Sequence, residues 1–310
     1  MLESRRSAYL FATFVTIAMG HNMVLIKSLL FQVEPLVLTY LRMVLCAITL
    51  VLLSIGYGIS VPKEKQQWLY LFIASFFGIF LHQITLALGL ELSQAANGAL
   101  ILGLNPLTTT LFAALLLKEP LSRRHYVGIL LGFIGIFSIV FKGFSTFAFS
   151  LGDIWLLISM ATQAFSFIYF RKLADTMHVV QVNMYTYLLG ALLLTVIPLT
   201  QDMSSVLNFD GFTWFKIFLA SAVLTALGFI GWNMCLHRLG AGGASIFLNV
   251  ITITAVFGSI VYLGEPLLTQ HIIGFLFISA GIWISTRQKR MKKETESIDL
   301  SLSESKSQSL

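Results

Sequence analysis

The sequence predicts an all-α membrane protein with ten transmembrane helices, arranged as two inverted five-helix repeats. Three observations support this prediction: a shortage of charge, a succession of apolar segments about 20 residues long, and an internal repeat. Of the 310 residues, 57% are hydrophobic and 11% are charged, and these are too few charges to cover a soluble globule of this size. The mean hydropathy of +0.85 agrees with this interpretation.

Each apolar segment is long enough to cross a bilayer, because about 20 helical residues span a hydrocarbon core about 30 Å thick. In the first half, residues 1–148, the predicted spans lie near residues 8–28, 36–59, 67–90, 94–117 and 125–142. In the second half, residues 149–286, they lie near residues 151–171, 179–200, 213–236, 242–263 and 270–286. Residues 143–152 form the predicted linker. The remaining segment, residues 287–310, is predicted to be a disordered cytoplasmic tail.

The distribution of basic residues among the loops predicts the orientation, since cytoplasmic loops carry an excess of Lys and Arg. One side of the predicted bundle collects Arg5, Arg6, Lys63, Lys65, Lys118, Arg123, Arg124, Arg171, Lys172, Arg238 and the basic residues that follow Thr286. The other side has Lys27, Lys142 and Lys216. Both termini are therefore expected in the cytoplasm, with the chain in the cytoplasmic (inner) membrane. The net charge of +6 favours contact with anionic lipid over nucleic acid.

An internal repeat relates the two halves. Glu119-Pro120-Leu121 recurs as Glu265-Pro266-Leu267. In the same register, His125, Gly128, Leu130, Gly135 and Ile136 recur as His271, Gly274, Leu276, Gly281 and Ile282. Because each half has an odd number of spans, the second copy enters the membrane from the opposite side. Inverted repeats of this kind are typical of secondary transporters.

The chain resembles the drug/metabolite transporter superfamily, specifically proteins with two EamA domains, over about residues 8–286. The resemblance lies in the repeated ten-span plan and in three local stretches. These stretches are Leu38-Thr-Tyr-Leu-Arg-Met with Arg42, the segment from Ala95 to Pro106, and Lys118-Glu-Pro-Leu with Gly264-Glu-Pro-Leu. The resemblance implies two EamA-like repeats of five spans around a central cavity. Exporters of amino acids and other metabolites are common in this family.

Polar side chains in the middle of the predicted spans are candidates for function, because they are costly in hydrocarbon unless they face a partner or a wet cavity. The candidate substrate-binding residues are His21, Asn22, Tyr40, Arg42, His82, Gln83, Asn105, Gln163, Tyr185, Trp232 and Asn249. The fifth and tenth spans contribute almost nothing polar. We therefore expect a central pathway lined by the first four spans of each half.

Several of these polar residues allow a structural interpretation as well. Ser166, Thr252 and Asn97 are predicted mainly to hold helices together. His21 and the His82-Gln83 pair could equally face a cavity or serve packing. Arg42 could bind a substrate carboxylate or phosphate, but pairing with helix-end carbonyls or Glu34 is preferred here.

Three backbone features of the spans carry expectations of their own. A kink is expected at Asn105-Pro106, because Pro lacks the N–H that continues the helix. Bending or close backbone approach is also expected at Gly240, Gly242 and Gly243. The glycines at 128, 132 and 135 are expected to serve internal packing rather than a dimer contact.

The absent residue types also limit the function. No Asp or Glu lies in the middle of a predicted span, which disfavours a cationic-drug/proton antiporter. The sequence lacks paired intramembrane carboxylates, metal-ligand spacing and an activated nucleophile, and Cys46 and Cys235 are isolated, so no enzyme, metal site or cofactor is predicted.

The sequence predicts a secondary transporter that exports a small polar metabolite, such as an amino acid, by alternating access. A non-transporting receptor or scaffold is the alternative. The expected partners are a small-molecule substrate, membrane lipid and, optionally, a second copy of the chain.

Overall fold

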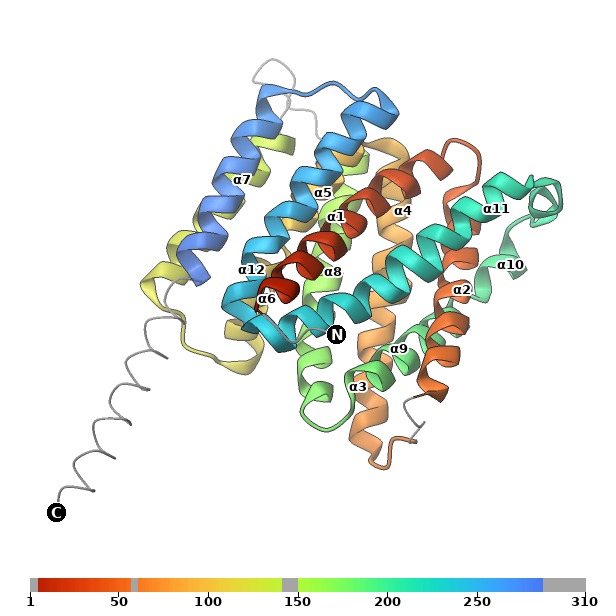
Figure 1. Ribbon diagram of the computed structural model, residues 1–310, viewed down its shortest axis with the longest axis horizontal. Coiled ribbons are helices and arrows are strands. Elements are labelled where there is room, and N and C mark those ends of the chain that lie inside the picture. Colours follow the sequence, from red (N-terminus) through yellow and green to blue (C-terminus); the bar gives the residue numbers. More distant parts are fainter. Residues whose placement is uncertain (1–4, 57–60, 141–149, 287–310) are drawn as a thin grey trace.

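The computed structural model describes residues 5–56, 61–140 and 150–286. Within these ranges the chain is helical apart from short connections, and it contains no strand (Figure 1). The all-α fold class predicted from the sequence is confirmed. The predicted tail, residues 287–310, and residues 143–149 of the predicted linker lie outside the described residues.

The first repeat contributes five spans, two of them interrupted. In chain order its elements are α1 (Arg5–Leu29), α2 (Pro35–Ile55), α3 (Lys65–Ser75), η1 (Phe76–Leu81), α4 (His82–Leu92), α5 (Ala95–Gly103), α6 (Asn105–Leu117) and α7 (Arg123–Val140). The third span consists of α3, the π-helical η1 and α4, and the fourth consists of α5 and α6. The break between α5 and α6 lies at Leu104, directly before Asn105-Pro106, where a kink was expected.

The second repeat follows the same plan. Its elements are α8 (Leu151–Ala174), α9 (Val179–Leu193), α10 (Val196–Thr200), η2 (Ser204–Asn208), α11 (Gly211–Phe218), η3 (Leu219–Leu227), α12 (Gly228–Leu263) and a C-terminal helix over Thr269–Thr286. Among the described residues, nine helical stretches are long and apolar enough to cross a membrane, and Phe247–Leu263 is a shorter apolar helix.

The 36-residue helix α12 contains a reversal of chain direction. Val15 and Met19 of α1 lie against Gly231 and Gly228 of α12, so along this part of α1 the residue numbers of the contacts in α12 decrease. Further along α1, Gly20 and Val24 lie against Thr254 and Gly258, so there the residue numbers of the contacts in α12 increase. The two ends of α12 therefore run in opposite directions along α1, as the two arms in Figure 1 do. With this reversal, the described residues contain nine helical stretches long enough to span a membrane and the shorter apolar helix Phe247–Leu263, ten in all.

Helix boundaries repeat with one constant spacing. Lys65 and Gly211 begin equivalent spans, Leu117 and Leu263 end equivalent spans, and Arg123 and Thr269 begin the last span of each repeat. The π-helical turns η1 and η3 occupy the same place in this register. Such turns are rare, so their recurrence at one position supports a duplicated backbone.

The last spans of the two repeats pack against each other through glycine. A Cβ atom added to Gly128 of α7 would lie 2.6 Å from the Gly281 carbonyl oxygen, and one added to Gly135 would lie 2.9 Å from that of Gly274. Gly128 and Gly274 are equivalent in the repeat, as are Gly135 and Gly281. Exchanging the two repeats therefore turns the Gly128–Gly281 contact into the Gly135–Gly274 contact, which is the pattern of a two-fold axis. The predicted internal role of the glycines in α7 is confirmed.

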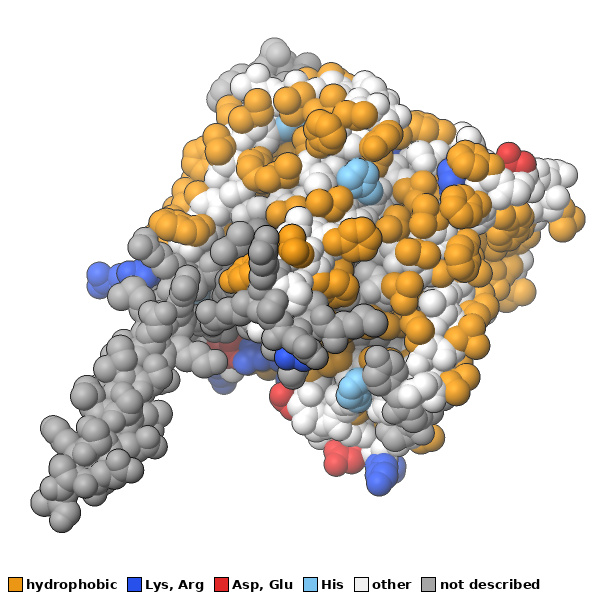
Figure 2. Space-filling model, in the orientation of Figure 1, with side chains coloured by type: hydrophobic (Ala, Val, Ile, Leu, Met, Phe, Trp, Pro, Cys, Tyr) orange, Lys and Arg blue, Asp and Glu red, His pale blue; other side chains and the backbone are white. Residues whose placement is uncertain are grey.

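The first helix of each repeat packs on the other repeat. Helix α1 makes its most extensive contacts with α12, whereas α8 packs along α3, η1, α4, α5 and α6. Large apolar side chains remain exposed on the outside of the bundle, for example Phe14, Leu130 and Phe137. Figure 2 shows hydrophobic side chains spread over the visible face and charged ones gathered near its edges. This distribution is that of an integral membrane protein with a lipid-facing belt.

Gly128→Ala tests the glycine contact. The added methyl group would overlap the Gly281 carbonyl, so we expect a loss of about 1–3 kcal/mol of stability. The measurement is the apparent unfolding temperature of the purified protein in detergent. Gly211→Ala is the matched control, because nothing lies within 4 Å of a Cβ atom there. Equal unfolding temperatures for the two variants would contradict the proposed packing.

Candidate functional site

A cavity of about 430 Å³ lies where the two repeats meet. Its walls come from α1, α2, α4, α5, α6, α8, η3 and both arms of α12. The apolar part of the wall includes Met19, Met23, Leu86, Phe167, Phe229 and Ile251. The polar part consists of Asn22, Arg42, His82, Gln83, Asn105, Thr109, Gln163, Thr225, Trp232 and Thr252. A mostly apolar cavity with a few converging polar groups is the usual form of a small-molecule site.

One polar group of the wall is a chain of hydrogen bonds centred on His82. Its Nδ1 lies 2.9 Å from the Ser159 carbonyl oxygen, and its Nε2 lies 3.1 Å from Nε2 of Gln163. The Gln163 amide oxygen in turn accepts a hydrogen bond from Asn105 Nδ2. These partners are consistent with a neutral imidazole that donates from Nδ1 to Ser159 and accepts at Nε2. The chain ends at Asn105 Oδ1, which is buried without a hydrogen-bond partner.

The second polar group is centred on Thr225. Its hydroxyl accepts hydrogen bonds from Asn22 Nδ2 at 2.9 Å and from an Arg42 guanidinium nitrogen at 3.3 Å, and it donates to the Ala220 carbonyl at 2.7 Å. The π-helical turn η3 places Thr225 five residues after its acceptor. The other terminal nitrogen of Arg42 lies 3.5 Å from the Gln83 amide oxygen.

The cavity continues towards one end of the bundle as a groove. This groove of about 320 Å³ shares Gln83, Gln163, Phe167, Phe229 and Trp232 with the central cavity. It ends at Arg171 and Ala174, which close α8, and at Val179, which opens α9. Arg171 and Ala174 are exposed. The central cavity is therefore reached from the end of the bundle that carries the connection between α8 and α9.

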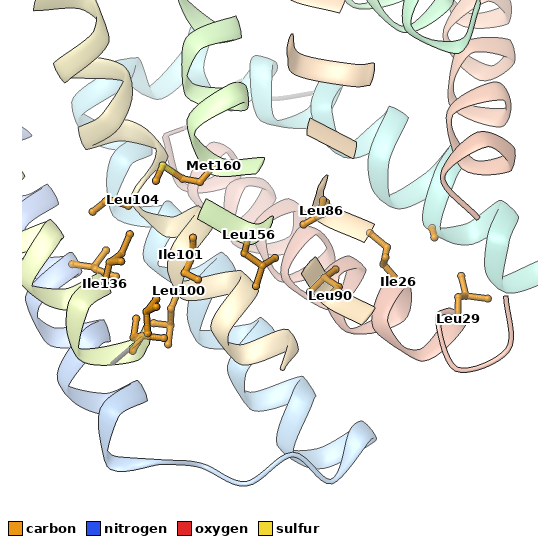
Figure 3. Packing of buried hydrophobic residues seen from close by; sticks show 14 of the residues in the cluster. Ile26, Leu29, Leu86, Leu90, Leu100, Ile101, Leu104, Ile136, Leu156 and Met160 are labelled. Atoms are coloured by element: carbon orange, nitrogen blue, oxygen red, sulfur yellow. The ribbon is translucent and has the colours of Figure 1, made fainter. Parts of the chain in front are cut away.

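The opposite end is filled by apolar side chains. Ile26 and Leu86 line the cavity and belong to a buried cluster that continues to Leu29, Leu90, Leu100 and Leu156. Figure 3 shows these side chains lying between α1, α4, α5 and α8. Leu29, Leu90, Leu100 and Leu156 are fully buried. This cluster separates the cavity from the connection between α12 and the C-terminal helix.

Beyond the apolar cluster, side chains from both repeats satisfy the helix ends. The Glu265 carboxylate accepts hydrogen bonds from the Ala95 and Ala96 amides, at 2.8 and 3.2 Å, and so caps the N-terminus of α5. The Lys27 ammonium donates to the Leu90 and Glu91 carbonyl oxygens, at 2.5 and 3.1 Å, at the C-terminus of α4.

A buried polar cluster lies next to these caps. His271 Nε2 lies 2.9 Å from Asn97 Oδ1, and Asn97 Nδ2 donates to Asp153 Oδ1 at 3.0 Å. The same carboxylate oxygen accepts from the Ser93 hydroxyl. The repeated histidine has a local reason as well: Nδ1 of His125 and of His271 each faces the backbone N–H three residues earlier.

Seven of the sequence-predicted site residues line the central cavity: Asn22, Arg42, His82, Gln83, Asn105, Gln163 and Trp232. The other four have different surroundings. His21 faces the Tyr262 ring, Tyr185 packs edge-on against Trp68, Asn249 accepts a hydrogen bond from Ser279, and Tyr40 packs beside a buried apolar cluster. Arg42 pairs with side chains of α4 and η3 rather than with Glu34.

Of the three residues predicted to hold helices together, one does so and two line the cavity or the groove. Asn97 joins helices within the buried polar cluster, while Thr252 lines the cavity and Ser166 lines the groove. Sequence reasoning missed Thr225, Thr109, Phe167 and Phe229. Thr225 is a polar residue in an otherwise apolar run, and that was the available signal. Among the described residues, no group of three or more His, Cys, Asp or Glu side chains is placed to hold a metal ion.

Comparison with known proteins identifies relatives over the whole membrane domain. The sequence profile of the EamA-like transporter family matches residues 6–141 and 150–287, one copy for each repeat. The uncharacterized transporter YyaM of Bacillus subtilis is 26% identical over 252 residues, covering 80% of this chain and 82% of that protein. The probable amino-acid metabolite efflux pump of Salmonella typhimurium is 22% identical over 311 residues, covering 94% and 98%. A crystal structure with 21% sequence identity superposes with a TM-score of 0.61, covering 93% of this chain and 99% of that one.

Cysteine accessibility tests the position of the cavity. Asn105 lines it and Asn249 does not, although both side chains are half-buried. In a protein whose two native cysteines are replaced by Ala, Asn105→Cys should react with a small water-soluble thiol reagent at least about tenfold faster than Asn249→Cys, because only a wetted thiol ionises readily. Equal rates would contradict this placement of the cavity.

Proposed function

The chain belongs to the EamA-like transporter family of the drug/metabolite transporter superfamily, and we propose that it is a secondary transporter that exports a small polar metabolite by alternating access. The amino-acid metabolite efflux named for the Salmonella typhimurium relative suggests amino acids or similar compounds as cargo. The observation that carries the proposal is a cavity between two inverted repeats that is open at one end and closed at the other. Inverted repeats supply two near-equivalent conformations around one such site.

The open end is proposed to face the cytoplasm. The groove ends at Arg171 and Val179, in a connection that belongs to the basic side of the predicted topology. The closed end carries the connection with Glu265, on the side that is poor in Lys and Arg. In this arrangement the cavity takes up cargo from the cytoplasm, as an exporter requires.

The repeated glutamate offers a reversible closing device. Glu265 caps the N-terminus of α5 in the first repeat, at the closed end. Its equivalent Glu119, at the open end, instead forms an ion pair with Arg171 at 3.0 Å. By the repeat register, Ala95 corresponds to Ala241, in the part of α12 where the chain reverses direction, and a break of α12 there would create an equivalent helix N-terminus. In the outward-open state Glu119 is proposed to cap that terminus, while Glu265 releases α5.

The cavity chemistry supports a polar cargo that is not a cation. Among the described residues, no Asp or Glu lines the central cavity or the groove. Asp153 is fully buried, but it lies in the polar cluster at the closed end. A cationic-drug/proton antiporter, which needs a carboxylate that alternately holds the drug and a proton, is not supported by this arrangement.

Flux through reconstituted vesicles tests the transport proposal. Asn105→Ala and His82→Ala each remove part of the hydrogen-bonded chain in the cavity, and each should lower substrate-dependent efflux about 5- to 150-fold, because a lost buried hydrogen bond costs roughly 1–3 kcal/mol. Screening labelled amino acids and related metabolites identifies the cargo. Asn249→Ala is the matched control, and it should transport as the wild type does. Full activity in both cavity variants would defeat the assignment of this cavity.

A second experiment tests the closure by Glu265. Glu265→Gln weakens two charge-assisted hydrogen bonds to α5, so the closed end should open more often. A membrane-impermeant thiol reagent added from outside should then label Asn105→Cys about tenfold faster than in the parent protein. Glu91→Gln, an exposed glutamate at the same end, is the control and should leave labelling unchanged. Rapid outside labelling of the parent itself would overturn the proposed sidedness.

A further inference from the structure

Arg42 places a full positive charge in the wall of the central cavity. Its exposed fraction is 2%, and it lies on α2 among the cavity-lining residues. A guanidinium stays protonated in proteins, so burial cannot be relieved by loss of the proton. The charge therefore needs a partner.

The partners inside the protein are few and neutral. One terminal nitrogen donates to the Gln83 amide oxygen at 3.5 Å and the other to the Thr225 hydroxyl at 3.3 Å, both long for charged hydrogen bonds. The Nε atom is buried without any hydrogen-bond partner. No carboxylate among the described residues lies within ion-pair distance of Arg42.

Acceptor oxygens without a hydrogen-bond partner belong to residues that line the same cavity as Arg42. The Thr225 hydroxyl donates its hydrogen to the Ala220 carbonyl oxygen, so it accepts hydrogen bonds from Arg42 and Asn22. Asn22 Oδ1, like Asn105 Oδ1, is buried without a partner. The cavity thus offers one charged donor with unused capacity and two neutral acceptors.

We propose that Arg42 is the anchor for the carboxylate of the cargo, and that the preferred cargo is a small organic acid with one net negative charge. This inference rests on the proposed transport function and narrows its substrate class. A net anion neutralises Arg42, whereas a zwitterionic amino acid would bring an ammonium group into a cavity that has no described carboxylate to receive it. A hydroxyl or amide N–H on the same molecule would satisfy the unpaired Asn105 oxygen.

The first test needs no ligand. A buried arginine whose anionic partner is the cargo lowers the stability of the ligand-free protein, whereas an arginine with a structural role raises that stability. Arg42→Gln keeps hydrogen-bonding capacity and removes the charge, and Asn22→Asp supplies an internal carboxylate beside the guanidinium. Both variants should unfold at a higher temperature than the wild type in anion-poor buffer. Lower unfolding temperatures for both variants would overturn the proposal.

The second test measures stabilisation of the purified full chain by matched probes. Lactate should raise the unfolding temperature more than alanine does, and lactamide and alaninamide should leave it unchanged, because only ligands of the folded state stabilise it. Arg42→Gln and Asn22→Asp should lose the lactate response, and Arg42→Lys should keep part of it. An equal response to lactate and lactamide, or no response to lactate, would contradict the proposal. A response to phosphate or chloride alone would show a site for inorganic anions and would equally overturn it.

Vesicle flux separates this inference from the transport function itself. If Arg42→Gln still exports a neutral or zwitterionic solute, the proposed role of Arg42 in binding the cargo carboxylate is refuted, while the transport function stands. Arg42-dependent stabilisation by lactate, without flux of any solute, would instead refute transport and leave the binding site.

Discussion

The structure depends on one contact, the antiparallel packing of α7 against the C-terminal helix through paired glycines. Gly128 meets Gly281 and Gly135 meets Gly274, and these pairs exchange under the internal repeat. Between helices surrounded by lipid there is no hydrophobic driving force, so close approach of small residues has to supply the attraction. Because this helix–helix contact is unchanged when the two repeats are exchanged, it also fixes a two-fold relation between the repeats. Once that relation is fixed, α1 must pack on the second repeat as α8 packs on the first.

The backbone is duplicated, but equivalent positions of the two repeats carry different side chains in the cavity wall. By the repeat register, Gln83 corresponds to Phe229 and Asn105 to Ile251, and all four residues line the cavity. One repeat thus presents amides where the other presents apolar surface. Two symmetric polar walls would create two equal sites and would double the cost of burying unpaired groups. Different chemistry at equivalent positions makes the two sides of the cavity unequal, so an amphipathic molecule would bind in one preferred orientation.

Much of this arrangement could be predicted from the sequence. The ten spans, the inverted repeat and the break at Asn105-Pro106 follow from apolar length, the Glu-Pro-Leu identities and the missing N–H of Pro. Seven polar candidates line the cavity because only a cavity or a partner can satisfy them in hydrocarbon. The direction in which a side chain points around its helix was not predictable. Asn249 and Tyr185 are polar residues inside predicted spans, as the cavity residues are, but they contact neighbouring helices. Thr225 enters the cavity wall through a π-helical turn, which apolar periodicity does not reveal.

The contacts at the two ends differ in strength, and this difference suits the proposed alternating-access cycle. The Arg171–Glu119 pair is solvent-accessible, with side-chain exposures of 65% and 42%, and an exposed pair of this kind contributes about 0–1 kcal/mol. Glu265 makes two charge-assisted hydrogen bonds, each worth roughly 1.5–3 kcal/mol, in a more protected place. The difference amounts to a few kcal/mol, which in the proposed cycle would favour closure at the Glu265 end without making that closure irreversible. Binding of the proposed anionic cargo at Arg42 would act on the same scale, and it would thereby shift the balance between the two proposed states.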